Sequence, residues 1–435
     1  MKKKQASLWL AVLAVFALFA AACGDDEADT TTTPAVEEAP AVEEEPMAEE
    51  EPMAEEEPMA EEPMAEEEPM AEEEPMAEEE PMAEEEPMAE AAMPGEGVTV
   101  NMARADWQSG YFQAQVYKQM LEELGYEVSE PSETELGPSL AYLAMAQGDV
   151  DFWANSWYPG HNSWWAPELP DGSTVGDHLE KVGAVFRGGG LQGLLITKSV
   201  ADEYGITHLD QLNDDPEIRA IFDTDGDGVA EFYGCQESWT CDDMMQSMIA
   251  FNGWENLVQT IAGYDAMFAE AVAKVEAGEP AVIYTWTPTA YITQLRPGDN
   301  VYWLAVENVL DDSNPLGLEG GEEFDQRYWA GTTDPVELDI PAEQCPARAN
   351  ADFCQIGWVP ADIQVTANSA WLAANPAAAE LLRQAKLSVV DVSLMNVEIQ
   401  GGRDTEAEIA ELAAGWIAEN RATVDEWLAA ALAAA

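Results

Sequence analysis

Tryptophan is the residue type whose placement in this sequence first points to binding chemistry. The chain has 15 tryptophans, and most of them need only fill the core. Trp157, Trp239 and Trp286 differ, because each falls at the end of an expected strand or in a constrained loop, where open α/β sheets bind ligands. An indole face attracts a cation more strongly than other side-chain rings do. These three are therefore candidate binding residues, although each one taken alone fits a purely structural role.

Four short segments contain these tryptophans or lie between them in the chain. They are residues 157–161 (Trp-Tyr-Pro-Gly-His), 222–228 (Phe-Asp-Thr-Asp-Gly-Asp-Gly), 234–241 (Gly-Cys-Gln-Glu-Ser-Trp-Thr-Cys) and 284–288 (Tyr-Thr-Trp-Thr-Pro). In this order they resemble segments of the glycine betaine/proline betaine-binding proteins of ABC osmoprotectant importers, and the similarity spans nearly all of residues 97–435. The resemblance implies a protein that binds a quaternary-ammonium osmolyte without catalysis, with the permease and ATPase of an importer as its partners.

The same resemblance assigns roles to six residues. In that family three tryptophans surround the quaternary ammonium group, and the matching residues here are Trp157, Trp239 and Trp286. The family holds the ligand carboxylate with two backbone N–H groups and a histidine, which correspond to Thr240, Cys241 and His161. The first of these backbone positions is often glycine in the family, and Thr240 departs from that pattern.

Elementary chemistry supports this arrangement independently. A trimethylammonium group has no N–H donor, whereas each aromatic face attracts it by about 0.5–2 kcal/mol once water is excluded. The carboxylate needs fixed donors, and a loop closed by a Cys235–Cys241 disulfide is suited to orient successive amides. Glycine betaine is the first expectation, and choline, carnitine or a sulfur betaine are the alternatives. A sensory or scaffold lipoprotein at the cell surface is the alternative of another class.

The cysteines indicate an oxidising compartment. Of the five, Cys23 is explained separately below, and the other four form two close pairs, Cys235 with Cys241 and Cys345 with Cys354. Four cysteines allow three connectivities, and local pairing has the lowest loop-closure cost. We therefore expect two local disulfides rather than a zinc site, which would need ligands at other spacings.

One loop resembles a calcium-binding loop. Residues 223–234 match an EF-hand at positions one, three, five and six, with Asp223, Asp225, Asp227 and Gly228. The twelfth position is Gly234 instead of the bidentate Glu that completes the calcium shell. A weak calcium site and a solvated turn both remain open, and no other cofactor is expected.

The N-terminus has the features of an export signal. Lys2, Lys3 and Lys4 precede an apolar run over residues 8–22, which is too short to span a membrane. Small residues then lead to Cys23, so residues 1–22 are predicted to be a lipoprotein signal peptide and Cys23 the lipid-bearing N-terminus. The alternative is ordinary secretion. Either way the protein is expected outside the cytoplasm, on the outer face of the membrane or in the periplasm.

Residues 23–96 are predicted to be a disordered tether. From Gly24 to Glu96 there are 31 acidic residues and no Lys or Arg, and Glu-Glu-Glu-Pro-Met-Ala repeats through residues 43–90. Repeated proline and like charge prevent a packed core, and roughly 50 such residues reach on the order of 150 Å. The formal net charge of the whole chain is −69. Because Lys2, Lys3 and Lys4 contribute +3 and residues 24–96 contribute −31, residues 97–435 carry a net charge of −41. This charge argues against a nucleic-acid partner.

The remaining sequence alternates strand and helix patterns. Apolar residues recur at every second position from Val98 and at every fourth from Phe112 to Leu124, and later segments repeat this alternation. We expect an α/β fold of the two-lobed periplasmic-binding type (type II-like), with crossovers near Gly190 and Ile363. Lobe 1 would comprise residues 97–190 and 362–435, and lobe 2 residues 191–361. Gly188, Gly190 and Gly193 have the GxGxxG spacing, but a strand-like run follows them, which favours a hinge over a dinucleotide site.

Overall fold

The computed structural model describes residues 93–309 and 340–435. The predicted signal peptide, Cys23 and residues 23–92 of the predicted tether lie outside them. All described residues belong to one compact unit. Within these residues, no helix has the length and apolar character needed to cross a membrane.

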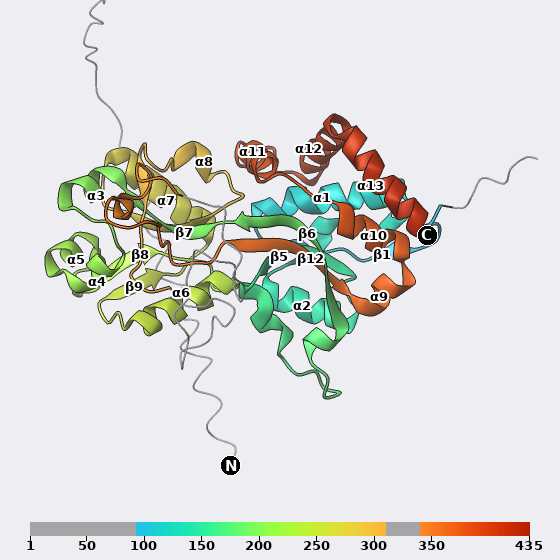
Figure 1. Cartoon of the computed structure of the whole chain (residues 1–435), viewed down its shortest axis with the longest axis horizontal. Coiled ribbons are helices and arrows are strands. Elements are labelled where there is room, and N and C mark those ends of the chain that lie inside the picture. Colours follow the sequence, from blue (N-terminus) through green and yellow to red (C-terminus); the bar gives the residue numbers. More distant parts are fainter. Residues whose placement is uncertain (1–92, 310–339) are drawn as a thin grey trace, which may run out of the picture. The chain divides into compact units, whose positions relative to one another are not determined.

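Lobe 1 is built around a three-stranded antiparallel sheet in the order β5-β12-β6, with short parallel pairs β1–β3 and β2–β4 beside it. Figure 1 shows helices around these strands, including the C-terminal helices in orange and red. Its strands are β1 (Thr99–Val100), β2 (Arg104–Ala105), β3 (Glu127–Val128), β4 (Glu135–Leu136), β5 (Phe152–Tyr158), β6 (Leu179–Gly190) and β12 (Ala361–Asn368). Its helices are α1 (Gln108–Glu123), α2 (Pro138–Gln147), α9 (Ser369–Ala374), α10 (Pro376–Gln384), α11 (Val389–Gln400), α12 (Glu406–Glu419) and α13 (Arg421–Ala434).

Lobe 2 contains a five-stranded mixed sheet in the order β11-β7-β10-β8-β9. Its strands are β7 (Gln192–Thr197), β8 (Ala230–Tyr233), β9 (Leu257–Thr260), β10 (Val282–Trp286) and β11 (Val301–Trp303). Its helices are α3 (Lys198–Tyr204), α4 (Asp210–Asp214), α5 (Pro216–Phe222), α6 (Thr240–Asn252), α7 (Tyr264–Ala277) and α8 (Tyr291–Gln294). The predicted two-lobed α/β architecture is confirmed.

The polypeptide passes between the lobes at the end of β6 and at the start of β12 (Figure 1). Only Leu191 separates β6 from β7, so one nearly continuous extended segment serves both sheets. Side chains hold this segment in place: Asp362 accepts the Gly188 N–H at 2.7 Å, and Thr287 Oγ1 accepts the Leu191 N–H at 3.1 Å. Gly188 and Gly190 lie in β6 and Gly193 lies in β7, so a strand continues where a dinucleotide site would need a helix, as the sequence predicted.

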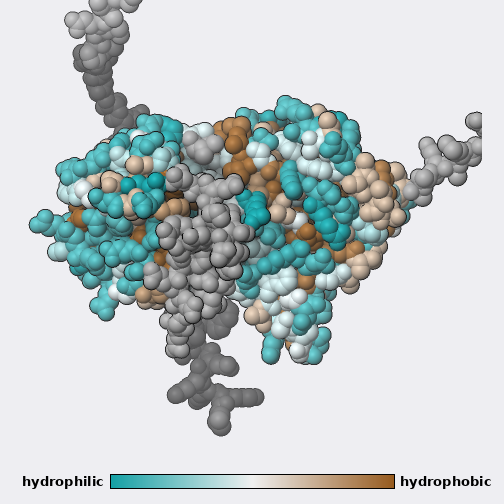
Figure 2. All heavy atoms as spheres, viewed as in Figure 1, coloured by the Kyte–Doolittle hydropathy of each residue, from teal (hydrophilic) through white to brown (hydrophobic). Residues whose placement is uncertain are grey.

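The sequence periodicity matches the observed burial. On α1, Phe112, Val116 and Met120 follow one another at every fourth position, and all are fully buried. The described chain begins slightly before the expected start of lobe 1, since the Gly95 N–H donates to the carbonyl of Leu124 at 2.9 Å. In Figure 2 hydrophilic residues cover much of the visible face, and a hydrophobic patch lies near α11, where Val390 and Leu394 are exposed.

Candidate functional site

A cavity lies between the lobes and contains all six candidate binding residues predicted from the sequence. It contains about 430 Å³ of space between atoms, part of it open to solvent. We call it the inner cavity. It is lined by Trp107, Pro138, Trp157, Gly160, His161, Gln192, Trp239, Thr240, Cys241, Met244, Tyr284 and Trp286. Lobe 1 contributes the first five of these residues and lobe 2 the remainder.

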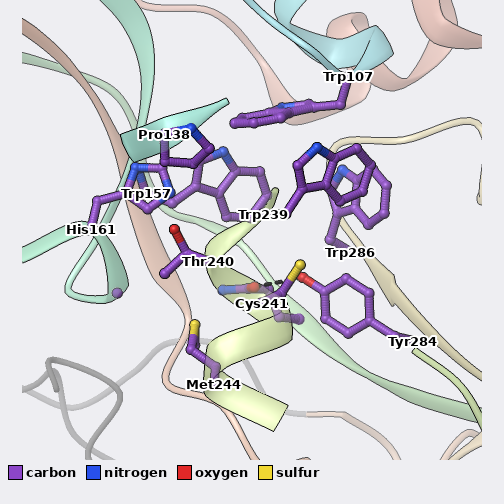
Figure 3. A pocket seen from close by; sticks show the side chains of 12 residues that line it. Trp107, Pro138, Trp157, His161, Trp239, Thr240, Cys241, Met244, Tyr284 and Trp286 are labelled. Carbon is purple, nitrogen blue, oxygen red and sulfur yellow. Dashed lines mark hydrogen bonds between the residues drawn. The ribbon is translucent and has the colours of Figure 1, made fainter. Parts of the chain in front are cut away.

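Four indole rings surround one part of the inner cavity. Figure 3 shows Trp157 on one side, Trp239 and Trp286 on the other, and Trp107 across the top. Trp239 meets Trp286 edge to face with ring centroids 5.4 Å apart, and it meets Trp107 in the same way at 5.7 Å. Such perpendicular packing fixes the rings relative to one another and leaves faces directed at a common space. The geometry is that of an aromatic cage for a cationic group.

Trp107 was not identified from the sequence. It precedes α1 as its N-cap residue and lies outside the four segments that carry the family resemblance. Its ring also packs edge to face on Trp153, with centroids 5.6 Å apart. The Asp-Trp dipeptide after a short strand was the only local signal, and it does not distinguish a cavity wall from a core residue.

His161 is held as a neutral hydrogen-bond donor. It lies in a 3₁₀ helix (Gly160–Trp165), stacks on Trp153 with ring centroids 5.8 Å apart, and accepts the Trp157 N–H through Nδ1 at 3.1 Å. With Nδ1 accepting, the ring proton resides on Nε2. Burial lowers the pKa of His161 to about 3, and the nearby charge of Lys181 acts in the same direction. The imidazole therefore stays uncharged at neutral pH and offers one N–H.

Thr240 and Cys241 form the first turn of α6, directly after Trp239 as its N-cap. Their backbone N–H groups belong to the helix terminus, where no intrahelical acceptor exists and the helix dipole favours negative charge. The predicted Cys235–Cys241 disulfide is present, with 5.9 Å between its Cα atoms, and ties the preceding loop to this turn. Sequence reasoning expected two aligned amides here but did not identify the helix N-terminus that supplies them.

The inner cavity has no ionised wall. None of its described lining residues is Asp, Glu, Lys or Arg, and His161 is neutral. Lining polar groups are the amides and hydroxyls of Gln192, Thr240 and Tyr284, and Tyr284 donates to Gln192 at 2.6 Å. Burying a net charge in such surroundings is costly, whereas a zwitterion brings its own counter-charge. The cavity therefore suits a small neutral molecule with separated charges.

Hydrogen bonds join the lobes beside the cage. The indole N–H of Trp239 in lobe 2 donates to Asp106 of lobe 1 at 2.9 Å. The indole N–H of Trp164 in lobe 1 donates to the Thr240 hydroxyl of lobe 2 at 2.9 Å. Burial raises the pKa of Asp106, and the bond from Trp239 partly opposes this rise. Two residues of the inner cavity thus also take part in bonds that bridge the lobes.

The glycine motif serves close packing against the cage. A Cβ atom added at Gly190 would lie only 2.8 Å from Cζ3 of Trp157. A Cβ added at Gly193 would lie 3.0 Å from Cζ3 of Trp303. Large rings therefore pack directly onto the backbone of the segment that connects the lobes. Close packing explains Gly190 and Gly193, and Gly188 has a positive φ of 62° that favours glycine, so the motif needs no phosphate ligand.

The calcium-like loop brings four carboxylates together. One oxygen each from Asp223, Asp225, Asp227 and Glu231 lies within 4.8 Å of the others. Asp223 also accepts backbone N–H groups of the loop, including that of Gly228 at 2.9 Å. Glu231 lies in β8 and was not among the residues matched to the EF-hand pattern. A weak calcium site and a solvated turn stay the two interpretations of this loop.

The second predicted disulfide, Cys345–Cys354, is also present, with 6.3 Å between its Cα atoms. Neither cysteine lines the inner cavity. Both are buried in lobe 2, so this bond crosslinks the lobe without forming part of the candidate site.

Comparisons with known proteins agree with this geometry. A family model, the substrate-binding domain of ABC-type glycine betaine transport systems, matches residues 98–419. The chain is 32% identical over 350 residues to the glycine betaine/proline betaine-binding periplasmic protein of Escherichia coli strain K12, covering 79% of this chain and 93% of that protein. It is also 32% identical to the glycine betaine-binding periplasmic protein OusX of Dickeya dadantii, with 79% and 92% covered.

Solved structures show the same fold at lower sequence identity. An ABC-transporter choline-binding protein in complex with choline has a TM-score of 0.54 at 16% identity, covering 77% of this chain and 96% of that one. Lactococcal OpuAC in its closed form with glycine betaine has a TM-score of 0.50 at 16% identity, with 76% and 99% covered.

Proposed function

The chain belongs to the family of substrate-binding domains of ABC-type glycine betaine transport systems, and on that premise we propose that its inner cavity captures glycine betaine. In this proposal Trp107, Trp157, Trp239 and Trp286 surround the trimethylammonium group. The backbone N–H groups of Thr240 and Cys241 and the Nε2–H of His161 bind the carboxylate.

The observation that carries this proposal is the combination of an aromatic cage and N–H donors in a cavity whose lining has no ionised side chain. Glycine betaine has one positive and one negative end and no net charge, so its burial leaves no uncompensated charge. Choline has the same cationic head but no carboxylate. It would leave the donors at His161 and α6 unpaired, which costs about 1–3 kcal/mol for each buried group. Betaine is therefore favoured over choline.

Titration calorimetry with glycine betaine, proline betaine, carnitine, choline and proline tests the ligand. We expect the two betaines to bind more tightly than choline. Trp157→Ala removes a cage wall and admits water, so it should weaken betaine by at least about 2 kcal/mol, or roughly thirtyfold. Trp427→Ala, on a helix outside the cavity, is the matched control. Wild-type affinity for every quaternary ammonium compound in a folded Trp157→Ala protein would contradict the cage.

We further propose that the protein is exported, anchored through a lipid on Cys23, and delivers its ligand to the permease and ATPase of an importer. The support is the run of basic, apolar and small residues before Cys23 and the family membership. Mass spectrometry of the membrane fraction should find a diacylglyceryl group on the N-terminal peptide that starts at Cys23. An unmodified N-terminus at another residue would contradict the anchor.

A further inference from the structure

A second cavity shares three tryptophans with the inner cavity. It contains about 890 Å³ of empty space, part of it open to solvent, and we call it the outer cavity. Trp107, Trp239 and Trp286 line both cavities, whereas Trp157 and His161 line only the inner one. The first turn of α1 borders the outer cavity from lobe 1, and the first turn of α7 borders it from lobe 2. The same indoles thus separate two distinct spaces.

The walls of the outer cavity are also aromatic. Tyr111, Tyr264 and Phe268 join the three shared indoles. The ring centroid of Tyr264 lies 4.6 Å from that of Trp286 and 5.5 Å from that of Trp239. These rings provide a surface that attracts cations, in the same way as the cage of the inner cavity.

The charges of the outer cavity differ from those of the inner one. Asp106 and Asp265 line it, and none of its described lining residues is Lys or Arg. Arg104 lies over the Tyr111 ring at 3.9 Å, but its guanidinium pairs with Glu135 at 2.8 Å and with Glu406 at 3.3 Å. The outer cavity therefore has a net negative lining, with one carboxylate from each lobe.

A buried hydroxyl group adds a polar contact without an assigned partner. Ser109 is 1% exposed, lines the outer cavity, and its Oγ has no hydrogen-bond partner within the described part of the chain. A buried polar group without a partner is unfavourable unless a ligand or water satisfies it. A bound water molecule or a ligand at this edge of the outer cavity would satisfy the Ser109 hydroxyl.

We propose that the outer cavity is a second binding site, which takes small organic cations that have no carboxylate, such as tetraalkylammonium ions. Aromatic faces bind the alkyl-substituted cation, and Asp106 and Asp265 supply its counter-charge. A zwitterion is disfavoured there, because its carboxylate would lie near two others. The two cavities would thus separate neutral betaines from cationic relatives of similar size.

The test is calorimetry on the full chain at about 150 mM salt, which screens the diffuse charge of the protein. The protein is first saturated with glycine betaine and then titrated with tetramethylammonium chloride. We expect a further one-to-one event with a dissociation constant on the order of 1 mM. If tetramethylammonium only displaces betaine, or gives no heat, the outer site does not exist.

Two variants separate the sites. Asp265→Asn, at an exposed position, should weaken tetramethylammonium binding by about fivefold or more, and Glu276→Gln, farther along α7, is the matched control. Trp157→Ala should lose betaine affinity and keep the tetramethylammonium event. An unchanged event in Asp265→Asn overturns the outer site. The outer-site proposal rests on its own residues: in the absence of betaine, an event that Asp265→Asn weakens and Trp157→Ala leaves unchanged belongs to the outer cavity, so failure of the inner-cavity proposal would be seen separately.

Discussion

The protonation of His161 leads to a prediction about both stability and binding. Burial lowers its pKa to about 3 in the folded protein, from an ordinary value near 6.5. Between these two values the unfolded chain holds a proton on this ring and the folded chain does not. Acid therefore favours the unfolded state, and the contribution of His161 to stability falls by about 1.4 kcal/mol per pH unit as the pH drops below 6.5. Above pH 6.5 this contribution is constant.

His161→Gln removes the titrating group while keeping an amide that can donate and accept. The many carboxylates also titrate in acid, so the useful quantity is the difference between wild-type and variant free energies of unfolding, measured by urea denaturation at each pH. From pH 6 to pH 4 the wild type should lose about 2–3 kcal/mol more than the variant. His178→Gln, whose ring lies outside the inner cavity, is the control. Parallel curves for wild type and His161→Gln would refute the reasoning.

The same property predicts how binding depends on pH. Because His161 stays neutral in the folded protein, its Nε2–H donor is present throughout the range from pH 5 to pH 8. The dissociation constant for glycine betaine, measured by calorimetry, should stay constant within about twofold there. A tenfold change with a midpoint near pH 6.5 would show that the imidazole is accessible and titrates normally.

Three further perturbations probe the cage and its supports by calorimetry with glycine betaine. Gly190→Ala should displace the neighbouring indole and weaken binding by about 5–150-fold, as overpacking costs about 1–3 kcal/mol; unchanged affinity would show that the ring is not held there. Asp106→Ala should weaken betaine binding by about 3–30-fold, because it removes the acceptor of the Trp239 indole N–H. This effect should vanish in a Trp239→Phe background, which already lacks the donor. An equal effect of Asp106→Ala in both backgrounds would exclude the interlobe bond as the cause. Replacing the Cys235–Cys241 disulfide with serines should weaken binding as well as stability, whereas removing the second disulfide should lower stability alone, by about 2–3 kcal/mol; equal losses of affinity would refute a special role for the first.

Local patterns were sufficient to predict the alternation of strands and helices and part of the site. The four-residue apolar spacing on α1 and the short cysteine loops are local features, and both predictions are confirmed. Trp157, Trp239 and Trp286 lie in segments that resemble a known family, so their convergence was expected. Trp107 carries no such signal. Its place in the cavity results from packing between segments more than 100 residues apart, which no window of sequence reveals.

The Asp106–Trp239 bond was missed for the same reason. Asp106 looks like an ordinary loop carboxylate, and only the docking of the lobes buries it beside an indole N–H. The glycine motif shows the opposite case. Its spacing was noticed in the sequence, but its cause, the close approach of a Trp157 ring to Gly190, required the packed structure.

The distribution of the cage between the lobes connects ligand binding with closure. Trp107 and Trp157 belong to lobe 1, and Trp239 and Trp286 belong to lobe 2, so no single lobe can surround a cation. A ligand that needs all four indole faces binds the protein more tightly when the lobes are together than when they are apart. It therefore shifts the population of molecules toward the arrangement with the lobes together, to an extent set by that difference in affinity. Trp239 takes part twice, as a wall of the inner cavity and as the donor to Asp106 across the lobes. In the joined arrangement the indole that donates across the lobes is also placed for the ligand, so we expect closure of the lobes and assembly of the cage to occur together.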